Sequence, residues 1–186
     1  MSSIRFGVIG AGQISCCDCG SISGHDQAEI IAVADPHPGR REEFAKKFNV
    51  AKTYEKGEDL LANADVDAVY IAVPNKFHAP MAECALRANK HVILDKPFAM
   101  NLNEALAVKE ATESSGKLFM LGMNQRLNTE HQKLKDICDR GVLGEIYHAK
   151  ACWMRRSGIP KLGTWFGKKE LAGGGSLLDI GVHMLD

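Results

Sequence analysis

The stretch that decides the fold of this chain is IRFGVIGAGQIS, residues 4–15. Its apolar first half predicts a strand from Ile4 to Ile9, and Gly10 allows the tight turn that must follow. The small Ser15 lets the next segment, a predicted helix, pack closely against that strand. The stretch therefore predicts a buried strand, a glycine turn and a helix in immediate succession.

The two glycines match the first two positions of the pattern G-x-G-x-x-[G/A], and Ser15 takes the third. Gly12 would let the backbone approach a pyrophosphate, whose charge suits the unpaired amides of a helix N-terminus. The match is weak alone, but Asp35 ends the second predicted strand, at the spacing where a carboxylate meets ribose hydroxyls. We therefore predict a dinucleotide site that includes Gly10, Gly12, Gln13, Ile14 and Asp35.

Asp35 favours NAD over NADP, because a carboxylate hydrogen-bonds a free 2'-hydroxyl but repels a 2'-phosphate. Arg40 and Arg41 follow closely, and a guanidinium can pair with such a phosphate. Arginines at such positions more often only cover a helix surface. NAD is thus the expected cofactor and NADP the alternative, with Arg40 counted among the cofactor-binding residues.

Short apolar runs alternate with segments of helical period along the first two thirds of the chain. The predicted strands are Ile4–Ile9, Glu29–Ala34, Ala68–Val73, His91–Leu94 and Leu118–Met123. The predicted helices are Gln13–Ile22, Arg40–Phe48, Gly57–Asn63, Phe77–Ala88, Leu102–Ser114 and Thr129–Asp139, with Asn101 as a cap three residues before Glu104. This order is typical of an α/β fold with a doubly wound parallel sheet, the Rossmann architecture.

The pattern changes after residue 125, where we place the end of a dinucleotide-binding domain spanning residues 1–125. Residues 126–186 are expected to form a junction and the incomplete start of a second, α+β domain, with a β-like segment at Glu145–Met154, a loop and a helix-like end. We expect the chain to be the front part of a longer enzyme. The part from Gly144 onward would then bury little apolar surface and be poorly ordered or covered by a partner.

Two predicted turns lie at the carboxyl ends of strands, where doubly wound folds bind ligands. The first turn contains Val73-Pro74-Asn75 and His78, whose residues could contact a cofactor or serve only as turn former and helix start. The second is Asp95-Lys96-Pro97. A lysine is usually a solvated surface residue, but the position of Lys96 at a strand end favours a catalytic role.

Asp179 and His183 are four positions apart, which on a helix places both on one face. An imidazole with a near-neutral pKa suits proton transfer, and a carboxylate one turn away could orient it. His183 could instead be a satisfied core histidine, and Asp179 a carboxylate favoured by a helix dipole. The residues alone leave both interpretations open.

Composition favours a protein that does not bind polyanions. The 23 basic and 23 acidic residues give a formal net charge of zero without blocks of either sign, which argues against nucleic acid or membrane partners. No apolar run reaches membrane-spanning length and no leader pattern precedes the first strand, so we expect a cytoplasmic protein. The six cysteines lack zinc-ligand spacing, so we expect reduced structural thiols and no metal site.

Several ordered motifs together resemble the glucose-fructose oxidoreductase, inositol dehydrogenase and MocA family of NAD(P)-dependent oxidoreductases. They are Gly10-Ala11-Gly12, Asp35, Val73-Pro74-Asn75 with His78, Asp95-Lys96-Pro97, Asn124-Gln125-Arg126, and Gly173 through His183. The resemblance covers the whole chain. The usual triplet of that family is Glu-Lys-Pro, so Asp95 keeps the acid but shortens it by one methylene.

The resemblance implies that Lys96, Asp179 and His183 form the catalytic set and that Asn124 and Arg126 lie near the cofactor or the domain junction. It implies hydride transfer between nicotinamide and a secondary hydroxyl of a sugar, cyclitol or related polyol, and a homo-oligomer at full length. Two alternatives remain, a non-catalytic dinucleotide-sensing protein and an NAD-dependent glycosidase on the same scaffold. The 186 residues by themselves are expected to lack full activity.

Overall fold

A computed structural model describes residues 3–154, 156 and 163–186 of the chain. They divide into two compact units, Met1–Leu121 and Gly122–Asp186, each of which is described by itself. The sequence-based division between residues 125 and 126 stays a prediction about domains. Among the described residues, no helix is both long and apolar enough to cross a bilayer.

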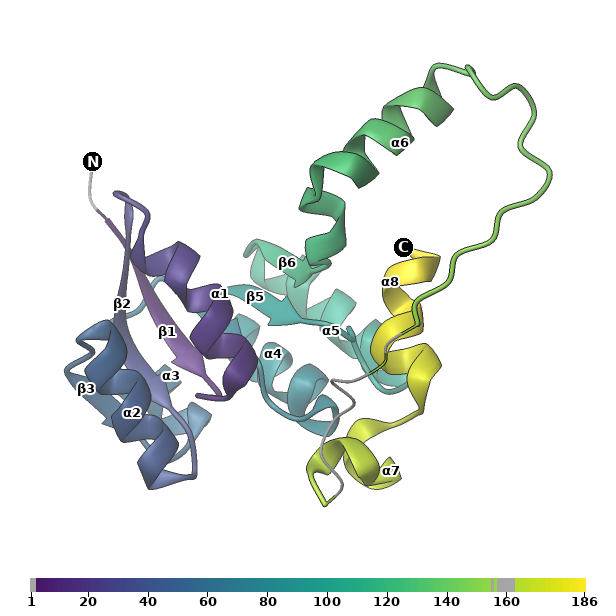
Figure 1. The fold of residues 1–186 in the computed structure, drawn as a ribbon. Coiled ribbons are helices and arrows are strands. Elements are labelled where there is room, and N and C mark those ends of the chain that lie inside the picture. Colours follow the sequence, from purple (N-terminus) through teal and green to yellow (C-terminus); the bar gives the residue numbers. More distant parts are fainter. Residues whose placement is uncertain (1–2, 155, 157–162) are drawn as a thin grey trace. The chain divides into compact units, whose positions relative to one another are not determined.

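The first unit is built on a six-stranded sheet in the order β3-β2-β1-β4-β5-β6 (Figure 1). Every pair with an assigned register is parallel. The strands are β1 (Ile4–Ile9), β2 (Ala28–Ala34), β3 (Lys52–Tyr54), β4 (Ala68–Ile71), β5 (His91–Asp95) and β6 (Phe119–Gly122). The chain winds outward from β1 in one direction and then, from β4, in the other, which confirms the predicted doubly wound sheet.

Helices cover both faces of this sheet and close two apolar cores. One core joins α1 and α2 to the sheet through Cys19 and Phe44, and the other joins α3, α4 and α5 through Leu60, Leu86 and Val108. Strands that are buried on both faces need such near-continuous apolar sequence. The helices are α1 (Gln13–Ser23), α2 (Pro38–Phe48), α3 (Gly57–Asn63), α4 (His78–Arg87) and α5 (Leu102–Ser115).

Two helix starts show how local sequence sets the boundaries. The Asn101 side chain accepts from the Glu104 amide at 3.0 Å, and the Glu104 carboxylate accepts from the Met100 amide at 3.0 Å, which confirms the predicted cap. Helix α2 begins at Pro38, earlier than the predicted Arg40, because His37 caps it and a proline suits the first helical turn.

Strand β3 was absent from the sequence prediction. Its three residues, Lys-Thr-Tyr, offer no apolar run, and two of them are exposed. The strand exists because its backbone pairs with β2, and the Asp35 amide donates to the Tyr54 carbonyl at 3.2 Å. Such an edge strand depends on a neighbour that is distant in sequence, so composition does not reveal it.

The second unit contains α6 (Thr129–Asp139), whose bounds match the prediction, and short helical segments that follow it. They are η2 (Asn124–Leu127), η3 (Trp165–Gly167), α7 (Lys169–Ala172), η4 (Leu177–Gly181) and α8 (Val182–Leu185). Most of the predicted loop before η3, residues 155 and 157–162, lies outside the described residues.

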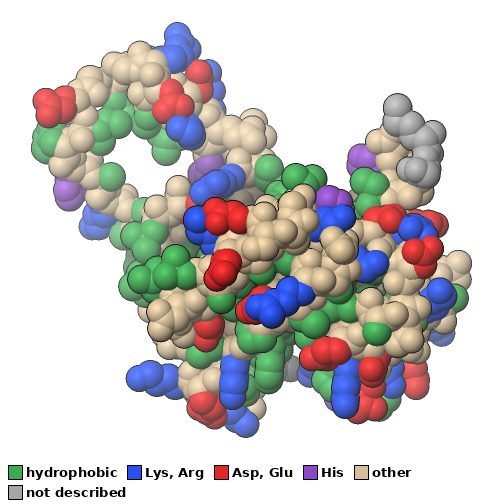
Figure 2. Space-filling view, turned by 180° about the vertical axis from the view of Figure 1, so that it is seen from behind, with side chains coloured by type: hydrophobic (Ala, Val, Ile, Leu, Met, Phe, Trp, Pro, Cys, Tyr) green, Lys and Arg blue, Asp and Glu red, His purple; other side chains and the backbone are tan. Residues whose placement is uncertain are grey.

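The predicted strand at Glu145–Met154 is wrong, since none of these ten residues is in a strand. A strand needs a neighbour to satisfy its backbone, and no described residue after Gly122 forms one. The segment is exposed instead. Figure 2 shows hydrophobic side chains on α6 and the segment after it, and Leu134, Val142, Leu143 and Ile146 are each more than half exposed. Ile146, Tyr147 and Met154 are 52%, 95% and 92% exposed, so the expectation of little buried apolar surface from Gly144 onward holds for residues 144–154. Ala172, by contrast, is buried.

One polar contact ties β1 to the loop before β4. The Asp67 carboxylate accepts from the Arg5 amide at 2.9 Å, from Nε at 3.0 Å and from Nη2 at 2.7 Å. These hydrogen bonds lower the pKa of Asp67 from 3.8 to about 2. Because the folded state holds the lower pKa, this stabilisation is present above about pH 4 and is lost as the pH falls toward 2.

We expect Asp67→Asn to lower the free energy of unfolding by about 1 kcal/mol near pH 7, since the pair is partly exposed, and by less at lower pH. Urea unfolding between about pH 3 and pH 7 measures this. The matched control is Asp65→Asn. The Asp65 side chain also accepts from Arg5 but is 78% exposed, so this substitution should lower the free energy of unfolding by less than Asp67→Asn does. A difference between wild type and Asp67→Asn that does not shrink with acid would contradict the assignment.

Candidate functional site

Gly10 lies between two strands at the point where the sheet reverses direction. Its amide donates to the Ala34 carbonyl at the end of β2, at 2.8 Å. On the other side, the amide of Ala72, the residue after β4, donates to the Ile9 carbonyl at 2.9 Å. Gly10 has φ +96°, and a Cβ there would collide with the Ala72 carbonyl. Only glycine fits this position.

Gly12 is different, because it has an ordinary φ of −79° and nothing within 4 Å of the position where a Cβ would be. It precedes α1, whose first residues Gln13 and Ile14 are exposed. Ser15 is fully buried and its hydroxyl donates to the Gly10 carbonyl, which holds the turn against the helix. Open space at Gly12 beside a helix N-terminus leaves room for the predicted pyrophosphate contact, which stays a prediction.

Asp35 is buried and braces this loop. One carboxylate oxygen accepts from the Ala11 amide at 2.8 Å and the other from the His37 amide at 2.8 Å. The Arg41 guanidinium donates to the Asp35 carbonyl at 2.6 Å, whereas Arg40 is exposed. The predicted ribose carboxylate therefore also fixes the glycine loop, a role for which the sequence carries no signal because Ala11 and Asp35 are 24 residues apart.

The turn after β4 holds Val73 and Pro74 half-buried and Asn75 buried. His78 begins α4 and is 1% exposed. Its Nδ1 lies 2.7 Å from the Pro97 carbonyl oxygen and its Nε2 lies 2.8 Å from the Val73 carbonyl oxygen. A contact between His78 and a cofactor stays a prediction, and it would use the carbon edge of the ring because both nitrogens face backbone.

Burial lowers the pKa of His78 below its ordinary value. The two carbonyls oppose this shift because they accept hydrogen bonds from a protonated ring, while the charge of Lys96 adds to it. The bridge from Val73 to Pro97 joins the turns after β4 and β5. His78 therefore links two loops that the sequence predicted separately.

The turn after β5 presents Lys96, which is half-buried. The Asp95 Oδ1 atom accepts from the Lys96 amide at 2.8 Å, and the peptide bond between Lys96 and Pro97 is cis. The short side chain of Asp95 thus bonds the very next amide. Parallel pairing places the residues that follow β1, β2, β4 and β5 at one edge of the first unit, namely Gly10, Asp35, Val73–His78 and Asp95–Pro97.

The second unit holds the remaining predicted site residues. Asn124 and Arg126 are exposed in η2, and Arg126 Nε lies 2.8 and 2.7 Å from the two Asp186 carboxylate oxygens. This pairing raises the pKa of Arg126 and lowers that of Asp186. Arg126 thus has a carboxylate partner that sequence analysis did not identify.

Asp179 lies in the π-helical turn η4 and His183 in the α-helical turn α8 that continues it. Single π-helical turns are frequent at functional sites. The Trp153 ring lies 6.2 Å from the His183 ring, centroid to centroid, with 37° between the planes. Both predicted residues therefore lie on one continuous helical segment, with an aromatic neighbour beside the imidazole.

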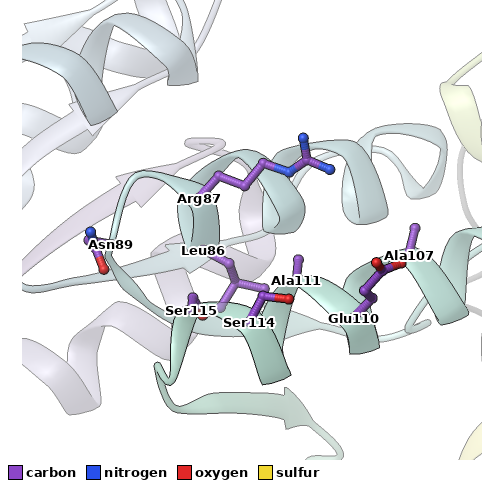
Figure 3. A pocket seen from close by; sticks show the side chains of 8 residues that line it. All are labelled: Leu86, Arg87, Asn89, Ala107, Glu110, Ala111, Ser114 and Ser115. Atoms are coloured by element: carbon purple, nitrogen blue, oxygen red, sulfur yellow. The ribbon is translucent and has the colours of Figure 1, made fainter.

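A hollow elsewhere in the first unit does not belong to this set. Figure 3 shows it between α4 and α5, lined by Leu86, Arg87, Asn89, Ala107, Glu110, Ala111, Ser114 and Ser115. Helices of a doubly wound fold run back from the carboxyl edge, so the C-terminal residues of α4 and α5 lie toward the amino ends of the strands. None of the predicted site residues lines this hollow.

Comparison with known proteins gives two matches to family descriptions. Residues 4–123 match an oxidoreductase family with an NAD-binding Rossmann fold, designated GFO_IDH_MocA, and residues 131–186 match the GFO/IDH/MocA C-terminal domain. The D-glucoside 3-dehydrogenase of Escherichia coli is 34% identical over 186 residues, which are 100% of this chain and 53% of that protein. The chain spans about half the length of the curated relatives it matches.

Solved structures agree with these matches. An NAD-binding protein from Listeria innocua gives a TM-score of 0.87 at 33% identity, over 99% of this chain and 53% of that one. A scyllo-inositol dehydrogenase from Lactobacillus casei, with bound NAD(H) and scyllo-inositol, gives 0.74 at 27% identity, over 77% of this chain and 43% of that one.

The two loop glycines offer a matched pair of substitutions. We expect Gly12→Ala to change the free energy of unfolding by less than about 1 kcal/mol, because the protein leaves room for the methyl group, yet to weaken NAD binding about tenfold or more. Gly10→Ala should destabilise the fold by more than about 1–2 kcal/mol. Urea unfolding measures the stability of both variants, and calorimetric titration measures their affinity for NAD. Unchanged NAD affinity in Gly12→Ala would refute the predicted pyrophosphate contact at Gly12.

Proposed function

The chain belongs to the GFO/IDH/MocA family of NAD-binding oxidoreductases, and on this premise we propose that it transfers a hydride between nicotinamide and a secondary hydroxyl of a sugar, cyclitol or related polyol. The observation that carries the proposal is the open cradle at Gly12 beside the braced carboxylate of Asp35, at the same sheet edge as Lys96. A cofactor loop and a lysine at one edge are what such a reaction requires.

The residues proposed to hold the dinucleotide follow from that edge. Gly12 and the first amides of α1 suit the pyrophosphate, and Asp35 suits the ribose, since a carboxylate that already accepts two amides retains further lone pairs. Gly10, Gln13 and Ile14 follow from the same glycine motif, and Arg40 is proposed for the 2'-phosphate of NADP. The remaining contacts are proposed from the family resemblance: Val73, Pro74, Asn75, His78, Asp95, Lys96, Pro97, Asn124 and Arg126. Bound NAD supplies the acceptor for the hydride.

The proton steps are assigned to the chain's own side chains. His183 accepts the hydroxyl proton of the substrate, because an imidazole can serve as a base near neutral pH. Asp179, on the same helical segment, orients the ring and stabilises its charged form. Lys96 donates a hydrogen bond to the substrate oxygen as it gains negative charge. The three roles rest on the residue types and the family resemblance.

Relatives support the substrate class. The Escherichia coli relative is a D-glucoside dehydrogenase, and the Lactobacillus casei structure holds scyllo-inositol, so both are named for ring-shaped polyols. We therefore propose pyranosides and cyclitols as the first compounds to screen. A cytoplasmic location and a homo-oligomer remain part of this proposal.

Two alternatives differ from it in a measurable way. A dinucleotide-sensing protein would bind NAD and show no turnover, although Lys96, Asp179 and His183 are all present. An NAD-dependent glycosidase would release a free sugar from a glycoside, so product analysis on glycosides and on free sugars separates it from a dehydrogenase.

Cofactor preference is tested by calorimetric titration with NAD and NADP at one salt concentration. We expect NAD to bind more tightly, and Asp35→Ala to reduce the ratio of NAD to NADP affinity about tenfold, because the carboxylate favours a free 2'-hydroxyl. The ratio of the two affinities is the readout because general damage to the glycine loop would weaken the binding of NAD and NADP alike. The matched variant Arg40→Ala should weaken NADP only, and an unchanged ratio in Asp35→Ala would exclude the ribose contact.

Turnover is tested in the protein that carries this chain, with a polyol screen that follows NADH absorbance. We expect Lys96→Met and His183→Asn each to lower kcat about 100-fold or more, because both residues act on the substrate hydroxyl. The NAD affinity of His183→Asn should stay within a few-fold, because His183 is not among the proposed cofactor contacts. The exposed Lys109→Met serves as a control, since its amine only pairs with Glu113 on α5. Full activity in either site variant would exclude its role.

A further inference from the structure

We propose that His78 is a positioning residue for Lys96: its imidazole spans the turns after β4 and β5, and by donating to the Pro97 carbonyl it fixes the backbone that presents the lysine. This inference rests on the role proposed above for Lys96. It replaces the cofactor contact proposed for His78, because both ring nitrogens face backbone carbonyls.

Distance and burial support the bridge. The ring nitrogens lie 2.7 Å from the Pro97 oxygen and 2.8 Å from the Val73 oxygen, and the side chain is 1% exposed. A neutral imidazole carries one N–H, so it donates to one of the two carbonyls. A buried carbonyl without a donor costs about 1–3 kcal/mol, so an N–H on Nδ1 stabilises the turn at Pro97. Because Val73 and Pro97 are 24 positions apart in sequence, no local hydrogen bond could replace this one.

Two further hydrogen bonds hold the turn after β5 and the segment that leads to α5. Asp95 accepts from the Lys96 amide at 2.8 Å, and Glu104 accepts from the Met100 amide at 3.0 Å. Asp95 therefore fixes the peptide unit that ends at the Lys96 amide, and Glu104 of α5 fixes the chain at Met100, three residues after Pro97. The Pro97 carbonyl lies between these two points and the His78 ring bonds it, so loss of the donor lets the backbone beside Lys96 shift.

The side-chain chemistry allows a matched pair of variants. In asparagine the amide nitrogen is bonded to Cγ, as Nδ1 is in histidine, whereas the amide nitrogen of glutamine lies farther out, toward the place of Nε2. His78→Asn thus keeps a donor near Pro97, and His78→Gln keeps one near Val73. We expect His78→Gln to lower kcat about tenfold, with KM and NAD affinity within a few-fold, and His78→Asn to retain most activity.

A control variant comes from the opposite end of β5. His91 Nδ1 accepts from the Leu118 amide at 3.0 Å, so His91→Ala also removes a histidine that bonds a distant backbone group. The midpoint of thermal unfolding should fall in the variants at both His78 and His91. Of these variants only His78→Gln should lower kcat markedly, and an equal loss of kcat in His91→Ala would show that His78 acts through general stability alone.

A spectroscopic readout needs no turnover. In nitrogen-15 spectra of the wild-type protein we expect a proton on His78 Nδ1 in slow exchange with water, and His78→Gln should shift the amide signals of Lys96 and Phe98 while His91→Ala leaves them in place. A bare Nδ1, or unshifted Lys96 and Phe98 signals, would overturn the inference. If no polyol is oxidised at all, the proposed function fails while these spectra still decide the role of His78.

Discussion

The turn at Gly10 is the constraint on which the rest of the first unit depends. Its backbone lies between β2 and the residue after β4, with its amide bonded to Ala34 and no room for a Cβ beside Ala72. Neighbouring strands can approach this closely only because glycine tolerates φ +96°. The sheet reverses its winding direction at this point, and the space that opens beyond Gly12 is where an anionic ligand would be received.

Hydrogen bonds between distant residues then hold the loops around that turn. Asp35 joins the glycine loop to the start of α2, and His78 joins the turn after β4 to the one after β5. The Asp35 carboxylate accepts from two backbone amides, and the single N–H of a neutral His78 ring donates to a backbone carbonyl. These backbone groups would otherwise lose their hydrogen bonds to water. Asp35, Lys96 and the other site residues proposed in these turns therefore lie on loops that a few buried polar side chains keep in place.

Sequence patterns were most informative where a property is local. Strand β1, helices α3 and α6, and the Asn101 cap all follow from short-range apolar period or side-chain geometry. Patterns failed where the outcome depends on a partner strand. Lys52–Tyr54 became a strand because β2 lies beside it, whereas Glu145–Met154 has the composition of a strand but no neighbour among the described residues.

The sequence by itself determined the doubly wound fold, the family and the identity of the candidate site residues, because glycine turns, apolar period and motif order are all properties of residues close together in the chain. Only the tertiary structure decided what those residues contact. That Asp35 braces Ala11, that His78 spans Val73 and Pro97, and that Arg126 pairs with Asp186 are contacts between residues 24 or more positions apart, or between two separate turns. The contacts of Asp35 and His78 form only once the strands have fixed their register, and that of Arg126 only once the chain between residues 126 and 186 has folded back, so no local pattern encodes them.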